Sequence, residues 1–265
     1  MSQPVFVTPY IEAAWKAARA KYPEQHGTWI DLSARLAGRI SIVPLMMNVQ
    51  RLGDLDLLLR AMEDEASANS SSLRGMSMAF HYQLMLSETW VVVCYEALRV
   101  VRDRERKAAA LELAKDPAFL QDDISSLASF KAIFHDVELL RMPITKYEIA
   151  KDSKMKGALN LRAIPANGDA TDDRVYEKSD PARSHIMPTG ISARASVMWQ
   201  VLDHVAFKEH WVERRDLADR LLTLTDEVEP AGLREARLAA DKSEVNASSA
   251  NGAIDSLPDE PSGTA

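Results

Sequence analysis

The 265-residue sequence contains a single cysteine, and this scarcity limits the structures it can form. One thiol makes no disulfide within the chain and cannot supply the paired cysteines of a structural zinc site. Cys94 lies inside an apolar run, so we expect a small buried side chain and not a nucleophile, because a reactive thiol needs exposure and a nearby base. Few cysteines, together with residues 1–10 that lack a secretory pattern, lead us to expect a cytoplasmic protein.

The motifs of several enzyme classes are also absent. The sequence has no glycine-rich phosphate loop ending in Lys-Ser/Thr, no Gly-x-Gly-x-x-Gly after a strand and no Gly-x-Ser-x-Gly elbow. It also has no run of about 18 apolar residues, since the best candidate, residues 77–101, is interrupted by charged and polar side chains that are costly in lipid. We therefore expect neither a bound cofactor nor a membrane span.

The formal net charge of -7 argues against binding nucleic acid through bulk charge. Much of the acidic excess lies near the end of the chain, so the preceding part is closer to neutral. The segment after Val228 has no aromatic residue and is rich in small and polar residues. Because it has little to bury, we expect residues 228–265 to form a disordered acidic tail.

Helical periodicity dominates the first 150 residues. The strongest segment, Ser77–Val101, is apolar over most of its circumference, so we expect it to be a central helix covered by other elements. Other helical patterns cover residues 8–23, 28–49, 55–65 and 127–143, with a kink or break at Pro44 and a stop at Pro143.

The period changes to two beyond Gly157. We predict extended segments at residues 158–165, 184–192, 196–203 and 207–214, and a closing helix that Asp216 caps. Val197, Trp199 and Val201 point to one face of the third segment, which pairs with the fourth in a hairpin. We expect Trp199 and Trp211 to be cross-strand neighbours there.

These patterns predict an α+β fold. Its mainly helical N-terminal part surrounds a buried central helix and precedes a small antiparallel sheet, a closing helix and the disordered tail. We expect one domain at residues 1–227, with a helical part at 1–150 and a sheet-containing part at 157–227. A long apolar helix is also compatible with self-association.

Ionisable side chains interrupt the central helix at seven-residue steps and share one face: His81, Glu88, Tyr95 and Arg102. His135 and Glu138 lie one turn apart on the following long helix, and carboxylates and imidazoles inside a bundle can hold a transition metal. The chain lacks the repeated Glu-x-x-His motif of dinuclear bundles, so we predict a structural cluster without metal, in which an arginine neutralises a buried glutamate. The predicted buried polar cluster comprises Glu88, Arg99, His135, Glu138 and Arg141.

Arg74 and His81 are the candidate catalytic residues. An arginine followed at this distance by a histidine loosely resembles the pair that lines the RNA-cleavage cleft of the HEPN ribonucleases. The resemblance covers only residues 74–81 and departs from the family pattern at Gly75, where members usually have a polar residue. It implies His81 as general acid or base and Arg74 as the group that stabilises phosphorane charge. We do not assign the chain to that family.

Two basic segments could contact an anion. Residues 102–107 alternate arginine and lysine with Asp103 and Glu105, which predicts a solvated helix end whose field the acids largely cancel, with a phosphate anchor as the alternative. Arg214 and Arg215 lie at a predicted strand-to-helix junction, where they could bind a phosphate. Pairing with a neighbouring acid, namely Glu213, Asp216 or Asp219, is the favoured interpretation.

The leading functional hypothesis is a non-catalytic intracellular interaction or regulatory protein, with a protein partner or a second copy of the chain as its partner. Its basis is the lack of a specific catalytic signature together with the acidic tail. One alternative is a metal-independent ribonuclease-like toxin or defence effector that uses Arg74 and His81. The other is a helical-bundle metalloprotein.

Overall fold

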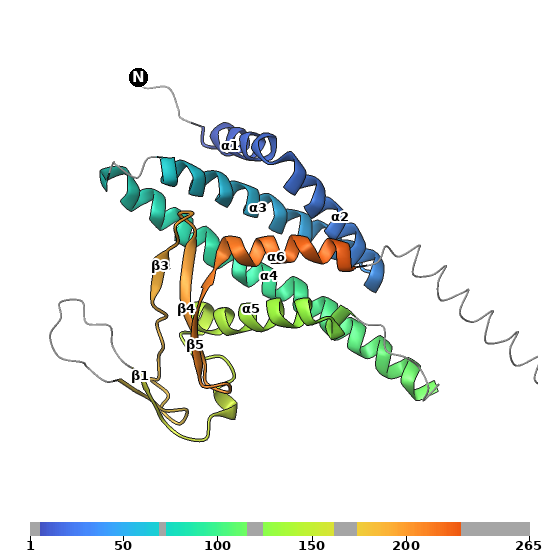
Figure 1. Ribbon diagram of the computed structural model, residues 1–265, viewed down its shortest axis with the longest axis vertical. Helices are drawn as coiled ribbons and strands as arrows, with labels where there is room; N and C mark the ends of the chain where they lie inside the picture. Colours follow the sequence, from blue (N-terminus) through green and yellow to red (C-terminus); the bar gives the residue numbers. More distant parts are fainter. Residues whose placement is uncertain (1–5, 69–72, 116–123, 162–173, 229–265) are drawn as a thin grey trace, which may run out of the picture. The chain divides into compact units, whose positions relative to one another are not determined.

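The computed structural model describes residues 6–68, 73–115, 124–161 and 174–228 (Figure 1). Within these ranges the side chains of residues 73–78, 113 and 174 are not described, and the predicted tail lies outside them apart from Val228. The described part is mainly helical with two small antiparallel sheets, which confirms the predicted α+β class.

The helices follow the predicted periodicity, with bounds that differ at several ends. They are α1 (Thr8–Lys21), α2 (Pro23–Ile40), α3 (Val43–Ala68), α4 (Leu73–Lys115), α5 (Ala128–Lys146) and α6 (Arg214–Glu227), with short 3-10 turns η1 (Ile124–Ser126) and η2 (Asp152–Lys154). The predicted break near Pro44 is confirmed, because α2 ends at Ile40, Ser41 after it adopts the left-handed conformation, and Pro44 falls in the first turn of α3.

The prediction that Pro143 ends α5 is wrong. The helix continues to Lys146, and Tyr147 in the left-handed conformation follows it. A proline removes only its own amide donor, and here the amide of Tyr147 still donates to the Pro143 carbonyl oxygen at 3.1 Å, which closes the last turn.

Helix α4 is the long central helix that the sequence predicts. Helices α3 and α5 both pack against it. Its buried side chains recur at steps of three and four residues: Gln83, Ser87, Trp90, Val91, Cys94, Ala97, Leu98, Val101 and Glu105. Cys94 is fully buried and burial raises the pKa of its thiol, as expected for a core side chain. Nearer the N-terminus of the helix, Tyr82 and Met85 are about half exposed.

Two antiparallel sheets occupy the C-terminal half of the described chain. In the first, β1 (Leu159–Leu161) pairs with β2 (Arg174–Tyr176); in the second, β4 (Val197–Asp203) lies between β3 (Thr189–Ile191) and β5 (Lys208–Glu213). Burial alternates strictly along β4, so its predicted inner face is confirmed. That face packs against α5 and α6 (Figure 1).

The two tryptophans of the hairpin are not cross-strand neighbours as predicted. Trp199 pairs with Val212, whereas Trp211 pairs with Gln200. Because side chains alternate along a strand, Trp199 lies on the buried face and Trp211, 46% exposed, lies on the opposite face.

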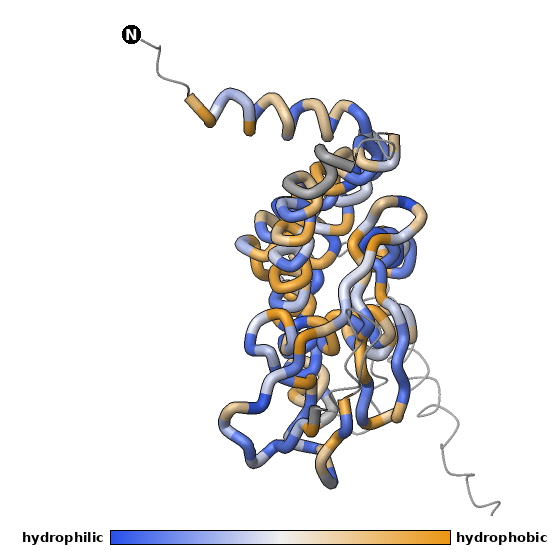
Figure 2. Tube along the Cα trace, turned by 90° about the vertical axis from the view of Figure 1, so that its left-hand side faces the viewer, coloured by the Kyte–Doolittle hydropathy of each residue, from blue (hydrophilic) through white to orange (hydrophobic). Residues whose placement is uncertain are grey.

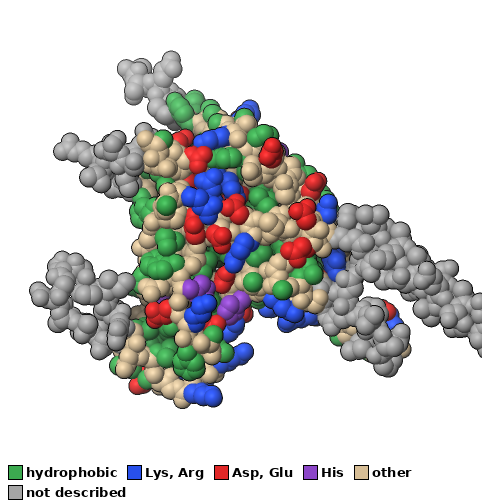
Figure 3. Space-filling view, viewed as in Figure 1, with side chains coloured by type: hydrophobic (Ala, Val, Ile, Leu, Met, Phe, Trp, Pro, Cys, Tyr) green, Lys and Arg blue, Asp and Glu red, His purple; other side chains and the backbone are tan. Residues whose placement is uncertain are grey.

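The distribution of side chains follows this packing. Hydrophobic and hydrophilic positions alternate along the helices at helical spacing (Figure 2). On the face drawn in Figure 3, acidic and basic side chains are interspersed and form no large area of one charge. No helix among the described residues is long and apolar enough to cross a membrane.

Candidate functional site

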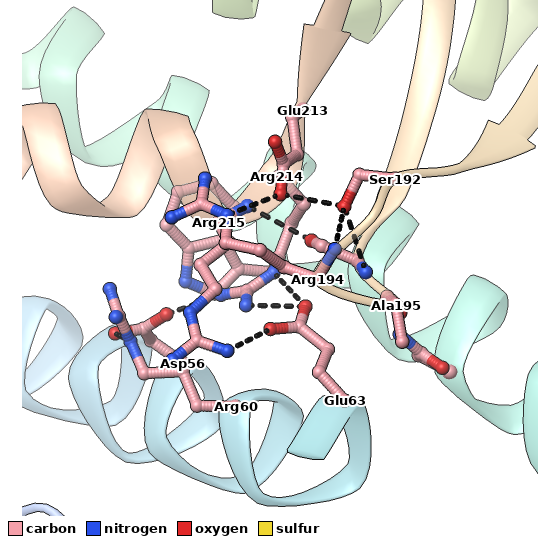
Figure 4. A network of polar contacts seen from close by, with 12 residues as sticks. Asp56, Arg60, Glu63, Ser192, Arg194, Ala195, Glu213, Arg214 and Arg215 are labelled. Atoms are coloured by element: carbon pink, nitrogen blue, oxygen red, sulfur yellow. Dashed lines mark hydrogen bonds and ion pairs between the residues drawn. The ribbon is translucent and has the colours of Figure 1, made fainter. Parts of the chain in front are cut away.

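A network of buried charges joins α3 to the point where β5 runs into α6 (Figure 4). Arg214, the first residue of α6, is fully buried, and its guanidinium donates to the carboxylates of Asp56 and Glu63. The Nη2 to Oε1 distance to Glu63 is 2.6 Å. Asp56 also accepts hydrogen bonds from Arg60 at 2.8 Å and from the indole of Trp29 at 2.9 Å. These pairs compensate charges that would otherwise be costly to bury.

Arg215 also turns toward α3. It contacts Asp64 at 3.0 Å and Glu63 at 3.6 Å. Partial burial acts to raise the pKa of Asp64, but hydrogen bonds from Lys21, Tyr22 and Arg215 dominate and lower it to about 2.

The partners of both arginines therefore differ from the predicted ones. Glu213 and Asp219 are paired with Arg194, and Asp219 also with Arg60. The partners of Arg214 lie about 150 residues earlier in the sequence, so no local pattern could identify them. Its donors are directed at the protein's own carboxylates, which is the arrangement of a structural network.

A pocket of about 210 Å³ lies between α4 and α5, beside η1. We call it the α4–α5 pocket. Two of its basic side chains are one turn apart on α4, and two more are one turn apart on α5. Its lining consists of Arg102, Arg106, Ser125, Phe130, Lys131, Phe134, His135 and Glu138.

Buried Glu105 organises one end of this pocket. Its carboxylate accepts hydrogen bonds from the Arg39 Nε and from the amide of Ile124, both at 2.9 Å, so it fixes the start of η1 against α4. The sequence-based interpretation counted Glu105 among the acids that cancel the field of residues 102–107. The structure directs it inward, while Arg102 and Arg106 line the pocket.

The cations of the pocket are held in different ways. The Arg102 guanidinium lies 4.1 Å from the centroid of the Phe134 ring and donates to Asp103 at 3.1 Å. Arg106 and Lys131 are exposed and have no ion-pair partner among the described residues. Glu138 is paired with Lys151 at 2.8 Å, so the pocket's own carboxylate is neutralised.

His135 connects the pocket to the hairpin. Its Nε2 lies 2.9 Å from the Asp203 carboxylate, and its Nδ1 lies 3.3 Å from the Lys151 ammonium. Asp203 also accepts the amides of Val205 and Ala206 in the turn between β4 and β5. Burial acts to raise the pKa of Asp203, but these hydrogen bonds and His135 outweigh it and lower the pKa. Each ring nitrogen of His135 therefore lies within hydrogen-bonding distance of one of the protein's own side chains.

The predicted buried cluster does not form as one group. Lys151 brings His135 together with Glu138, and Glu96 brings Arg99 together with Arg141. The arginines meet a different acid from those predicted: Arg99 pairs with Glu96 at 2.8 Å, and Arg141 lies 3.9 Å from Glu96 and over the Tyr95 ring.

Glu88 is half-buried, and this burial raises the pKa of its carboxyl group. Sequence reasoning missed Lys131, Lys151 and Asp203, because none of them belongs to a motif and their partners come from other elements.

The weak catalytic candidates lie at the other end of α4 from the pocket. His81 is exposed, and Arg74 belongs to the first turns of the helix with a side chain outside the described residues. Among the described residues, no group of three His, Cys, Asp or Glu side chains could hold a metal ion.

Comparison of the chain with models of protein families, with curated protein sequences and with solved structures found no match.

Proposed function

We propose that this chain is a non-catalytic regulatory protein that acts by binding a ligand in the α4–α5 pocket. The observation that carries the proposal is that Arg106 and Lys131 line the pocket without an ion-pair partner among the described residues, beside a histidine whose two ring nitrogens each contact a side chain. The two cations can attract an anionic ligand, whereas the histidine has no ring nitrogen available to take a proton from it. The single cysteine supports a cytoplasmic setting for this role.

His135 is the residue on which a catalytic interpretation of the pocket would depend. A general base needs a ring nitrogen with a free lone pair within reach of the substrate. Asp203 occupies Nε2, and Lys151, itself held by Glu138, occupies Nδ1. We therefore assign His135 a positioning role, in which it holds the hairpin turn and Lys151 next to the pocket.

An RNA-cleavage assay tests this proposal. The purified chain and its His81→Ala and His135→Ala variants are incubated with a dye-quenched single-stranded RNA, and we expect all three to cleave no faster than buffer. Cleavage by the unchanged chain that either substitution abolishes, with circular dichroism showing an intact fold, would overturn the non-catalytic assignment. Loss in His81→Ala alone would support the ribonuclease-like alternative with Arg74.

Metal analysis of the purified chain tests the metalloprotein alternative separately. The non-catalytic proposal expects less than stoichiometric metal. Stoichiometric metal that is lost in a Glu138→Ala variant would contradict it.

A further inference from the structure

We propose that the α4–α5 pocket binds the phosphate group of a small phosphate monoester, with the rest of the ligand directed to solvent. This inference rests on the proposed function and names the ligand of the same site. It follows from the charge, the size and the rigidity of the pocket.

The charge of the pocket matches one phosphate. Asp103 offsets Arg102, and Lys151 offsets Glu138, which leaves Arg106 and Lys131 as two cations without a partner among the described residues. A phosphate monoester carries a charge of about -1.5 to -2 at neutral pH. Arginine and lysine are the side chains that proteins use for this group, arginine because its planar fork can donate two parallel hydrogen bonds.

The size of the pocket favours a phosphate group over a whole nucleotide or cofactor. Pockets that enclose drug-sized ligands measure roughly 300–1,000 Å³. The α4–α5 pocket, at about 210 Å³, is smaller than that range, and its lining reaches the exposed surface at Arg106 and Lys131. A phosphate can therefore enter while the group esterified to it remains outside.

The base of the pocket is rigid and apolar. Phe130 and Phe134 are buried one turn apart on α5, and their rings stack with centroids 6.2 Å apart. Arg102 is fixed over the Phe134 ring. A fixed guanidinium loses little freedom on binding, and an apolar base strengthens its attraction to an anion by reducing local screening.

The neighbouring basic residues provide matched controls. Arg104 lies two residues from Arg106 on α4, and is likewise exposed and without an ion-pair partner in the described ranges, but it does not line the pocket. Lys146 is exposed at the far end of α5, has no ion-pair partner in the described ranges and does not line the pocket, so it is the control for Lys131. Residues two apart on a helix do not share a face, so Arg104 tests charge without position.

Isothermal titration calorimetry on the full chain provides the test. Glucose 6-phosphate and adenosine 5′-monophosphate should bind with similar affinities, whereas glucose, adenosine and citrate should not bind. Arg106→Gln and Lys131→Gln should each weaken phosphate-ester binding about tenfold, as expected for the loss of a charge-assisted hydrogen bond. Arg104→Gln and Lys146→Gln should change the affinity less than about twofold.

The possible results distinguish a failure of the phosphate site from a failure of the proposed non-catalytic function. No binding of either ester, equal losses in the control variants, or equal binding of citrate would overturn the phosphate site and leave the non-catalytic assignment standing. Binding of a phosphoserine peptide without binding of the small esters would overturn the small-molecule assignment. Ester binding followed by release of inorganic phosphate would support the site and overturn the non-catalytic function.

Discussion

Among the single residues, Gly53 controls how closely α2 and α3 approach. It lies in the interior of α3, where glycine is otherwise unfavourable for a helix. A β-carbon at this position would lie 2.5 to 2.9 Å from side-chain atoms of Trp29 on α2. Trp29 is almost fully buried and its indole is bonded to Asp56, so it has little freedom to move away. The glycine therefore lowers the helix propensity of α3 but allows α2 and α3 to pack closely.

Gly53→Ala should destabilise the fold by about 1–2 kcal/mol, because the overlap with Trp29 outweighs the better helix propensity of alanine. Gly27→Ala in α2 is the matched control, since its added β-carbon would meet no atom within 4 Å among the described residues, apart from its chain neighbours and the backbone of its own helix. That variant should be more stable than the unchanged chain by about 0.5–1 kcal/mol. Urea unfolding of both variants measures the difference, and equal effects would contradict this account of Gly53.

His185 should make stability depend on pH. Its amide donates to the Tyr147 carbonyl oxygen at 2.6 Å, and burial lowers the pKa of its imidazole below the ordinary value of 6.5. The unfolded chain therefore takes up a proton at a higher pH than the folded chain does. Stability contributed by the neutral ring is fully present above pH 6.5 and is lost as the pH falls toward the lower pKa of the folded state.

Unfolding by urea at pH 7.5, 6.5 and 5.5 measures this dependence. His185→Gln removes the titrating group, so its stability should fall less over this range than that of the unchanged chain. His81→Gln makes the same substitution at an exposed histidine and is the control for the exchange itself. An unchanged slope in His185→Gln would show that other groups cause it.

At the scale of elements, α6 is tied to α3 by the buried Arg214. Arg214→Met should cost about 3–5 kcal/mol, because it leaves the buried carboxylates of Asp56 and Glu63 with one cation fewer. Arg194→Met removes an arginine of the same network whose side chain is 44% exposed, and should cost about 0–1 kcal/mol. Denaturant unfolding of both variants gives the two losses in free energy of unfolding, which are then compared. Similar losses would mean that the burial of Arg214 carries no special cost.

The elements themselves were largely predictable, whereas the contacts between them were not. Period 3.6 located the helices, and strict alternation along β4 located the buried face, because both depend on neighbouring residues. The partners of Arg214 are 151 and 158 positions away, and nothing local encodes them.

The pocket failed to emerge from the sequence for a related reason. Of the two acids at residues 102–107, Asp103 pairs with Arg102, whereas Glu105 enters the interior, and Arg106 lines the pocket without an ion-pair partner among the described residues. The sequence-based prediction that the acids cancel the positive field of residues 102–107 therefore underestimated the positive charge at the pocket.

At the scale of the whole molecule, the positive pocket belongs to an acidic chain. The net charge is -7, and the residues after Val228 contribute seven acidic and three basic side chains. The part through Val228 is therefore also negative, at about -3. A small ester responds to the local field of the pocket, whereas a long polyanion also experiences the charge of the rest of the molecule.

This difference predicts that the chain binds phosphate esters but not duplex RNA. Tight duplex binding requires cations at about 6–10 phosphates, and each contact adds nearly one unit to the slope of log affinity against log salt. The pocket offers two cations without partners in the described chain, Arg106 and Lys131, and acidic and basic side chains alternate over the face drawn in Figure 3. Fluorescence anisotropy of a labelled 20-base-pair RNA should therefore show no binding at micromolar protein in about 150 mM salt. Binding with a slope steeper than about -4 would require a basic surface beyond the α4–α5 pocket, and Arg106→Gln would then leave most of that affinity intact.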